Sequence, residues 1–161
     1  MRPCRVLHLV FPPCLLALWG CAPAAEDEGA APSLALGQGS VAFTPLEEDR
    51  VEVVFGPQGG WHVEPAVRGW GLDVEGLVLG YDLVDEAGGA WAYSVQALLG
   101  ENRVVALDDG GWERVGDRLV LDITSAEEVI GRQLTLGVRA TPAGGDALAL
   151  DTLVTLVDDA P

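Results

Sequence analysis

Few side chains in this sequence could carry out nucleophilic or acid–base chemistry. His62 follows Trp61 directly, and none of the four serines beyond the N-terminal apolar stretch stands in a Gly-x-Ser-x-Gly nucleophile elbow. A Ser94–His62–carboxylate arrangement stays open as a hydrolytic alternative. A single histidine beside an aromatic residue after a turn is more typical of a hydrogen-bonding strand residue. We therefore expect no catalytic residue and no enzyme.

Two pairs of neighbouring acids are the other candidates for chemistry. Asp85-Glu86 and Asp108-Asp109 could supply the two carboxylates of a glycosidase or oxygen ligands for Ca²⁺. The sequence has no D-x-D-x-D-G loop, and it lacks the cluster of His and Cys that zinc requires. We expect solvated acids in turns, with no metal and no cofactor. A calcium site formed by both pairs stays open as the alternative.

Three glycine pairs each lead into a tryptophan, namely Trp61, Trp91 and Trp112. If segments 61–66, 77–84, 91–98 and 103–107 each cross the domain, successive turns alternate between its two ends. All three tryptophans would then share one end with His62. Flat apolar rings beside carboxylates suit a sugar or a peptide, so this end is a candidate binding surface. The alternative is that each tryptophan covers a glycine turn or caps the core.

The elements that position these residues are strands. Apolar residues alternate in segments 51–55, 77–83, 91–97, 118–123 and 133–140, which indicates strands with one buried face. Glycine-rich turns separate the segments, and Ser125 with Glu128 has the spacing of a capping box, so one helical turn is expected there. The pattern predicts an all-β fold, an immunoglobulin-like antiparallel β-sandwich of about eight or nine strands. A barrel is the alternative.

The first 20 residues have the organisation of an export signal. Arg2 and Arg5 precede an apolar stretch from Val6 to Trp19, which is shorter than the roughly 20 residues that a membrane-spanning helix needs. We expect this segment to be removed. Cys4 and Cys14 would leave with it.

The run Leu18-Trp19-Gly20-Cys21 resembles the lipobox of bacterial lipoproteins, although Trp19 departs from the small or medium residue usual there. The resemblance implies that Cys21 becomes the first residue and carries a diacylglyceryl group that anchors the protein in the membrane. The residue after the cysteine is Ala22 and not Asp, which implies that the protein is transferred to the outer membrane. Whether it faces the periplasm or the cell surface stays open. The alternative is ordinary secretion with cleavage after Ala24.

Charge and composition define the rest of the chain. Without the signal, seven Arg stand against 25 acidic residues, a formal net charge of −18, and Lys is absent. Such a chain lacks the clustered cations that bind nucleic acid, and anionic headgroups would repel it. Residues 21–39 are predicted to be the lipidated cysteine with a flexible acidic tether, and residues 40–161 the sandwich domain.

The octapeptide Gly56-Pro57-Gln58-Gly59-Gly60-Trp61-His62-Val63 resembles a turn found in uncharacterised bacterial lipoproteins with one Ig-like domain. That resemblance implies a location and a fold, and no activity. The expected function is that of a membrane-anchored envelope lipoprotein with a non-catalytic binding or structural domain. Its expected partner is an envelope protein or glycan. A minimal hydrolase acting on envelope polysaccharide or peptide is the alternative.

Overall fold

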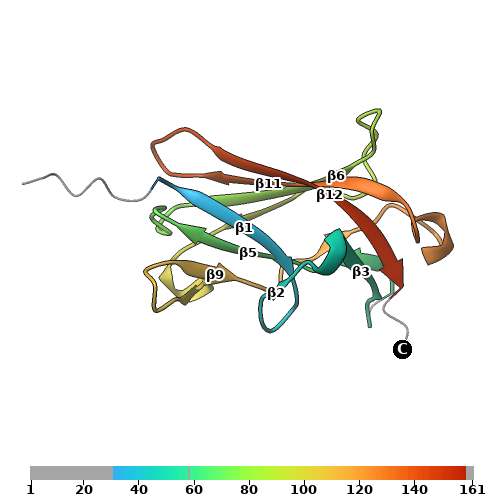
Figure 1. Cartoon of the computed structure of the whole chain (residues 1–161), viewed down its shortest axis with the longest axis horizontal. Helices are drawn as coiled ribbons and strands as arrows, with labels where there is room; N and C mark the ends of the chain where they lie inside the picture. The colour runs from blue at the N-terminus through green and yellow to red at the C-terminus, as the bar shows by residue number, and fades with distance from the viewer. Residues whose placement is uncertain (1–30, 58, 159–161) are drawn as a thin grey trace, which may run out of the picture.

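The computed structural model describes residues 31–57 and 59–158, which form two packed β-sheets (Figure 1). The first sheet has five strands in the order β2-β1-β5-β9-β8, all paired antiparallel. Its strands are β1 (Ser33–Gln38), β2 (Thr44–Pro45), β5 (Pro65–Trp70), β8 (Val105–Ala106) and β9 (Trp112–Arg114).

The second sheet has seven strands in the order β10-β4-β3-β12-β11-β6-β7. Every pair is antiparallel except β12 with β3, which run parallel. Its strands are β3 (Arg50–Phe55), β4 (Trp61–Val63), β6 (Val78–Val84), β7 (Val95–Leu98), β10 (Leu119–Val120), β11 (Gln133–Thr141) and β12 (Leu148–Asp158).

The sheet orders give the topology of an immunoglobulin-like sandwich. Strands β1, β5, β9 and β8 take the places of A, B, E and D, and β12, β11, β6 and β7 take those of G, F, C and C′. Of the twelve strands, β2, β8 and β10 have only two residues each, which leaves nine of three or more. The predicted all-β, immunoglobulin-like sandwich is confirmed, but the described residues form twelve strands rather than about eight or nine, and one pair, β12 with β3, is parallel.

Alternation along the longer strands builds the core between the sheets. Leu79, Tyr81 and Leu83 of β6 are at most 2% exposed, and the residues between them are half-buried. Fully burying an aliphatic side chain contributes about 1.5–3 kcal/mol, so these rows hold the sheets together. The buried rows continue on the neighbouring strands with Val51, Val53, Leu134, Leu136, Val138, Val154 and Leu156.

The two ends of the sandwich differ. We call the end where β1 begins, at Ser33 opposite Trp70, the near end; it lies at the left in Figure 1. We call the opposite end, with the turns after β3 and β6, the far end. There the seven-stranded sheet closes on itself, because isolated bridges join Val84 to Ala90 and Ala92 to Leu121.

The folded part of the chain begins earlier than predicted. Residues 33–38 were expected to belong to the tether, but they form β1 and pair with β5 over six residue pairs. Leu34 and Leu36 are half-buried and pack against the core. Only these two apolar residues alternate in a segment that is rich in Ala, Pro and Gly, which is too few to predict a strand. Strand β1 is therefore stabilised mainly by its pairing with β5. Cys21 and the predicted signal lie outside the described residues.

Three short 3₁₀ turns are the helical elements of the described chain: η1 (Glu47–Asp49), η2 (Glu101–Arg103) and η3 (Ala126–Glu128). The turn η3 confirms the predicted capping box, since Glu128 accepts hydrogen bonds from the backbone of Thr124 and Ser125 at 2.8 and 2.9 Å. Within residues 31–57 and 59–158, no helix has the length and apolar character needed to cross a bilayer.

Candidate binding surface

Strand β4 carries Trp61 and His62 directly after the turn that follows β3. In this turn the Gly56 amide donates to the Gly60 carbonyl at 3.0 Å, and the Gly59 amide donates to Gly56 at 2.9 Å. Gly59 and Gly60 have φ angles of +86° and +94°, which side-chain-bearing residues rarely adopt. This glycine turn therefore places Trp61 and His62 at the far end.

His62 is a buried residue of the sheet. It is 5% exposed, and the Gly56 backbone lies so close that a Cβ there would be 3.2 Å from the imidazole Cε1. The His62 Nε2 atom has no hydrogen-bond partner among the described residues, and it lies 3.5 Å from the Glu64 Oε1 atom. Arg118 Nε donates to the same Glu64 oxygen at 3.3 Å. Among the described residues, no serine hydroxyl is hydrogen-bonded to His62 Nε2.

Trp91 lies at the far end with Trp61. The Leu121 amide donates to the Trp61 carbonyl at 2.9 Å, and the Asp122 amide donates to the Trp91 carbonyl at 3.0 Å, so one short segment joins the two tryptophans. The Trp91 indole N–H donates to Asp85 at 3.1 Å. The Arg132 guanidinium lies 4.6 Å from the centre of the Trp91 ring. Both the N–H and one face of this ring are thus already occupied, as the capping alternative requires.

Trp112 does not join them, so the prediction of a shared surface of three tryptophans was wrong. Trp112 is 4% exposed, and its indole N–H donates to the Leu72 carbonyl at 3.2 Å, at the near end. Its ring lies on Gly69, where a Cβ would be only 2.3 Å away. The error came from segment 103–107, which was expected to cross the domain. It contains only the end of η2 and the two-residue β8, so the following turn stays at the near end.

Three apolar residues at the far end were not predicted to be exposed. Phe55 and Tyr93 are each 59% exposed, and Val120 is 42% exposed. The Phe55 ring meets the Trp61 ring edge-on, with 4.9 Å between centroids. The Tyr93 hydroxyl donates to Asp122 at 2.8 Å, and this hydrogen bond raises the pKa of Tyr93. Phe55 is the last residue of the alternating run of β3 and directly precedes a glycine turn. This position at the end of a strand is the feature of the sequence that could have predicted its exposure.

The paired acids of the turns lie far apart. Asp85 follows β6 at the far end, where it accepts hydrogen bonds from the Ala87 and Gly89 amides at 3.0 and 2.7 Å. Asp109 lies at the near end and accepts from the Gly111 amide at 3.1 Å. Hydrogen bonds from the Trp91 indole and the Gly89 amide lower the pKa of Asp85. The two pairs cannot form one calcium site, and no group of three His, Cys, Asp or Glu suited to a metal occurs in the described part.

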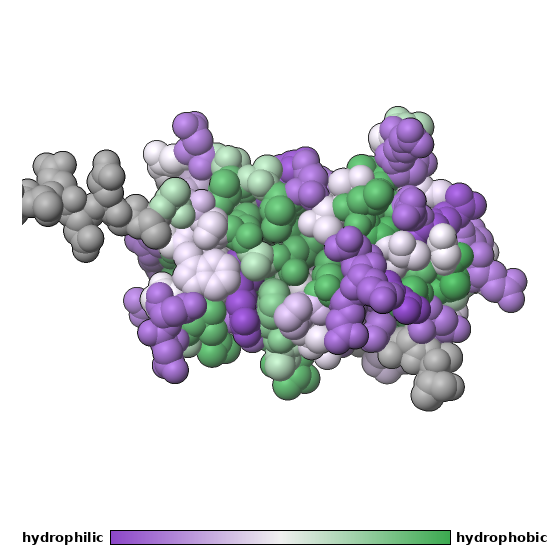
Figure 2. Space-filling view, viewed as in Figure 1, coloured by the Kyte–Doolittle hydropathy of each residue, from purple (hydrophilic) through white to green (hydrophobic). Residues whose placement is uncertain are grey.

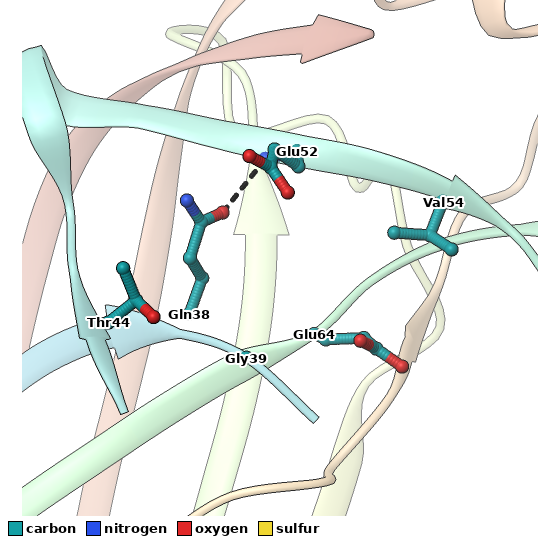
Figure 3. Close-up of a pocket in the computed structure, with 6 residues that line it drawn as sticks. All are labelled: Gln38, Gly39, Thr44, Glu52, Val54 and Glu64. Atoms are coloured by element: carbon teal, nitrogen blue, oxygen red, sulfur yellow. Dashed lines mark hydrogen bonds between the residues drawn. The ribbon is translucent and has the colours of Figure 1, made fainter. Parts of the chain in front are cut away.

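A groove lies between β2 and β3, where the two sheets separate (Figure 3). Its two parts have volumes of about 140 and 590 Å³. Figure 2 shows hydrophilic residues gathered over η1, which borders the larger part. We call it the acidic groove, because five carboxylates line it: Glu47, Glu48, Glu52, Glu64 and Asp158.

No protein-family model and no curated protein sequence matches this chain. The fold alone therefore defines its class, which is that of proteins with an immunoglobulin-like β-sandwich. The far end, with its exposed aromatic residues, and the acidic groove are candidate ligand-binding surfaces.

Proposed function

We propose that this chain is a lipid-anchored protein of the bacterial cell envelope, held by Cys21, whose sandwich is a non-catalytic module that binds an envelope protein or glycan. One observation carries the binding part of the proposal. The domain begins at the near end with Ser33, and its exposed Phe55 and Tyr93 lie at the far end.

The positions of the two ends of the domain fit an anchor at Cys21. Eleven residues lie between Cys21 and Ser33, so the twelve residue-to-residue steps from one to the other span at most about 40 Å even when fully extended. A membrane anchor at Cys21 therefore keeps the near end close to the bilayer. The far end is then the part of the domain presented to a partner.

Exposed aromatic side chains support recognition at that end. Aromatic residues offer large contact area at small cost in conformational entropy, and they are frequent among the residues that dominate binding energy. Phe55 and Trp61 form an edge-on pair, and the Tyr93 hydroxyl is held by Asp122. Both arrangements order the rings before a partner arrives.

The anchor is tested by growing cells with an alkyne fatty acid and labelling the protein. We expect label on the wild type and on Cys14→Ser, and none on Cys21→Ser. Label retained by Cys21→Ser contradicts the assignment. An unlabelled wild type supports secretion with cleavage after Ala24 instead.

Binding is tested by capturing envelope components with the full chain and with the double variant Phe55→Ala/Tyr93→Ala. The matched control is Leu98→Ala, because Leu98 is also 59% exposed but lies on β7 at the near end. We expect the double variant to lose its partner and the control to keep it. Equal capture by all three proteins contradicts recognition at the far end.

One observation favours the hydrolase alternative. Glu52 and Glu64 line the same groove, and a glycosidase requires two carboxylates on either side of its substrate. Hydrolysis of envelope polysaccharide that Glu52→Gln and Glu64→Gln both abolish would establish the enzyme. Under our proposal the wild type releases no product.

A further inference from the structure

We propose that a pocket at the far end binds one ring of an uncharged sugar polymer. We call it the Trp61 pocket, and the described residues that line it include Gly59, Gly60, Trp61, His62, Arg118 and Val120. This inference rests on the proposed binding function and specifies the partner as a neutral glycan. Its support comes from the shape of the pocket, its hydrogen-bond donors, its local charge and one buried polar atom.

The shape of the Trp61 pocket suits a single ring. Its volume of about 230 Å³ is smaller than the roughly 300–1,000 Å³ of typical small-molecule pockets, which limits the bound group to about one ring. The Trp61 indole offers a flat apolar surface, which can cover the C–H face of a pyranose. Strand β4 pairs with β3 on one side and with β10 on the other, so it offers an extended peptide no free strand edge here.

Hydrogen-bond donors without an acceptor meet in this pocket. The indole N–H groups of Trp91 and Trp112 both have acceptors, whereas no described residue accepts the hydrogen of the Trp61 indole. Arg118 donates to Glu64 only through Nε, and its two terminal nitrogens have no acceptor among the described residues. A sugar ring carries several hydroxyl oxygens close together, and each of them can accept a hydrogen bond from one of these nitrogens.

The Trp61 pocket is locally neutral within a strongly acidic chain. No carboxylate is found among its described lining residues, whereas five line the acidic groove. The charge of Arg118 is matched by Glu64, which lies outside the lining. A basic ligand finds no carboxylate in the pocket, and an acidic polymer is repelled by the net negative charge of the chain. A neutral ligand that is rich in hydroxyl groups is therefore favoured.

His62, a buried lining residue, gives an independent indication. Its Nε2 atom has no hydrogen-bond partner among the described residues and lies 3.5 Å from Glu64 Oε1. The bond from Arg118 to the same oxygen is also long, at 3.3 Å, since ordinary N–H···O bonds measure about 2.7–3.2 Å. When Arg118 turns toward a sugar, Glu64 can shift toward His62 and accept a hydrogen from Nε2. Binding would thus satisfy a buried polar atom whose lack of a partner costs free energy.

The test is saturation-transfer NMR on the full chain in micelles of a detergent that has no sugar headgroup. The probes are the linear trisaccharides of glucose, mannose, galactose and N-acetylglucosamine, with trigalacturonic acid as the acidic comparison. We expect saturable binding of at least one neutral trisaccharide and none of the acidic one. Absence of binding by every neutral trisaccharide, or equal binding of trigalacturonic acid, overturns the proposal.

The position is tested with Arg118→Gln, and Arg139→Gln is the matched control. The two arginine side chains are 56% and 48% exposed, both lie beside carboxylates, and each substitution removes one positive charge. Arg139 lies outside the pocket. Arg118→Gln should weaken binding about tenfold, because it removes hydrogen bonds from a charged donor, and Arg139→Gln should bind as the wild type does. Equal affinities of the two variants overturn the assignment to the Trp61 pocket.

The indole N–H signals in ¹H–¹⁵N spectra give a local readout. Bound sugar should shift the Trp61 signal, which is assigned by its loss in Trp61→Phe, and should leave the signal of the buried Trp112 in place. A Trp61 signal that stays in place while sugar binds overturns the site. Failure here and failure of the proposed function remain distinguishable. Capture of an envelope protein without sugar binding overturns only this inference, whereas equal capture by the far-end variants contradicts the proposed function.

Discussion

Replacing Asp117 should destabilise the domain more than any exposed acid does, because this carboxylate joins the two sheets. Tyr81 on β6 of the seven-stranded sheet donates its hydroxyl to Asp117 at 2.9 Å. Arg114 on β9 of the five-stranded sheet donates its Nε to the same carboxylate at 3.1 Å. Asp117 is 8% exposed and Tyr81 is 2% exposed. Burial, followed by the Asp117 charge, raises the pKa of Tyr81.

The expected change in the free energy of unfolding depends on which buried groups each substitution leaves without a partner. Removing one partner of a buried ion pair costs about 3–5 kcal/mol, and the lower end applies because the Arg114 side chain is still 20% exposed. We expect Asp117→Ala to lower the free energy of unfolding by about 3 kcal/mol. Tyr81→Phe removes one hydroxyl and should cost about 1 kcal/mol. In the Asp117→Ala background its cost should nearly vanish, since the hydroxyl has already lost its partner.

The assay is urea unfolding followed by tryptophan fluorescence. Asp108→Ala is the matched control, because Asp108 is an exposed acid in a turn. A loss below about 1 kcal/mol for Asp117→Ala, or equal losses for the two alanine variants, would refute the role of the carboxylate between the sheets.

Two further predictions concern the tryptophans. Gly69→Ala should destabilise the domain by about 1–3 kcal/mol, because the new methyl group would overlap the Trp112 ring; Gly80→Ala, whose Cβ meets nothing closer than 3.9 Å, should be near neutral in the same urea assay. The lowered pKa of Asp85, caused by the Trp91 indole and a backbone amide, contributes stability that is present above about pH 4 and is lost as the pH falls below it. Asp85→Asn should therefore flatten the fall in melting temperature between pH 5 and 2, and an unchanged pH profile would contradict this.

The fold was predictable where apolar alternation is long. Leu79, Tyr81 and Leu83 alternate with half-buried residues, and this period predicts a strand with one buried face whatever its partners are. The η3 turn was predictable because a capping box is local chemistry between Ser125 and Glu128. Strand β9 has three residues and β8 has two, which is too short for a periodic signal.

The candidate site was predictable only in part. The glycine turn before Trp61 places that residue at the far end, and it could be predicted because the glycines that form the turn directly precede Trp61 in the sequence. The place of Trp112 depends on how often the chain crosses the sandwich between two turns. Segment 103–107 does not cross it, so Trp112 lies at the near end and not at the far end. The acidic groove could not be found from the sequence, because it forms where β3 changes partners and Gln38 comes from another sheet.

Cross-linking in living cells is the most direct test of the claim that the domain is anchored and that its far end contacts a partner. A photoreactive amino acid replaces Val120 at the far end or Val105 at the near end, two valines that are 42% and 58% exposed. The account predicts a cross-link to an envelope component from position 120, none from position 105, and loss of the first when Cys21→Ser removes the anchor. Equal cross-links from both positions, or a cross-link that Cys21→Ser leaves unchanged, would contradict it.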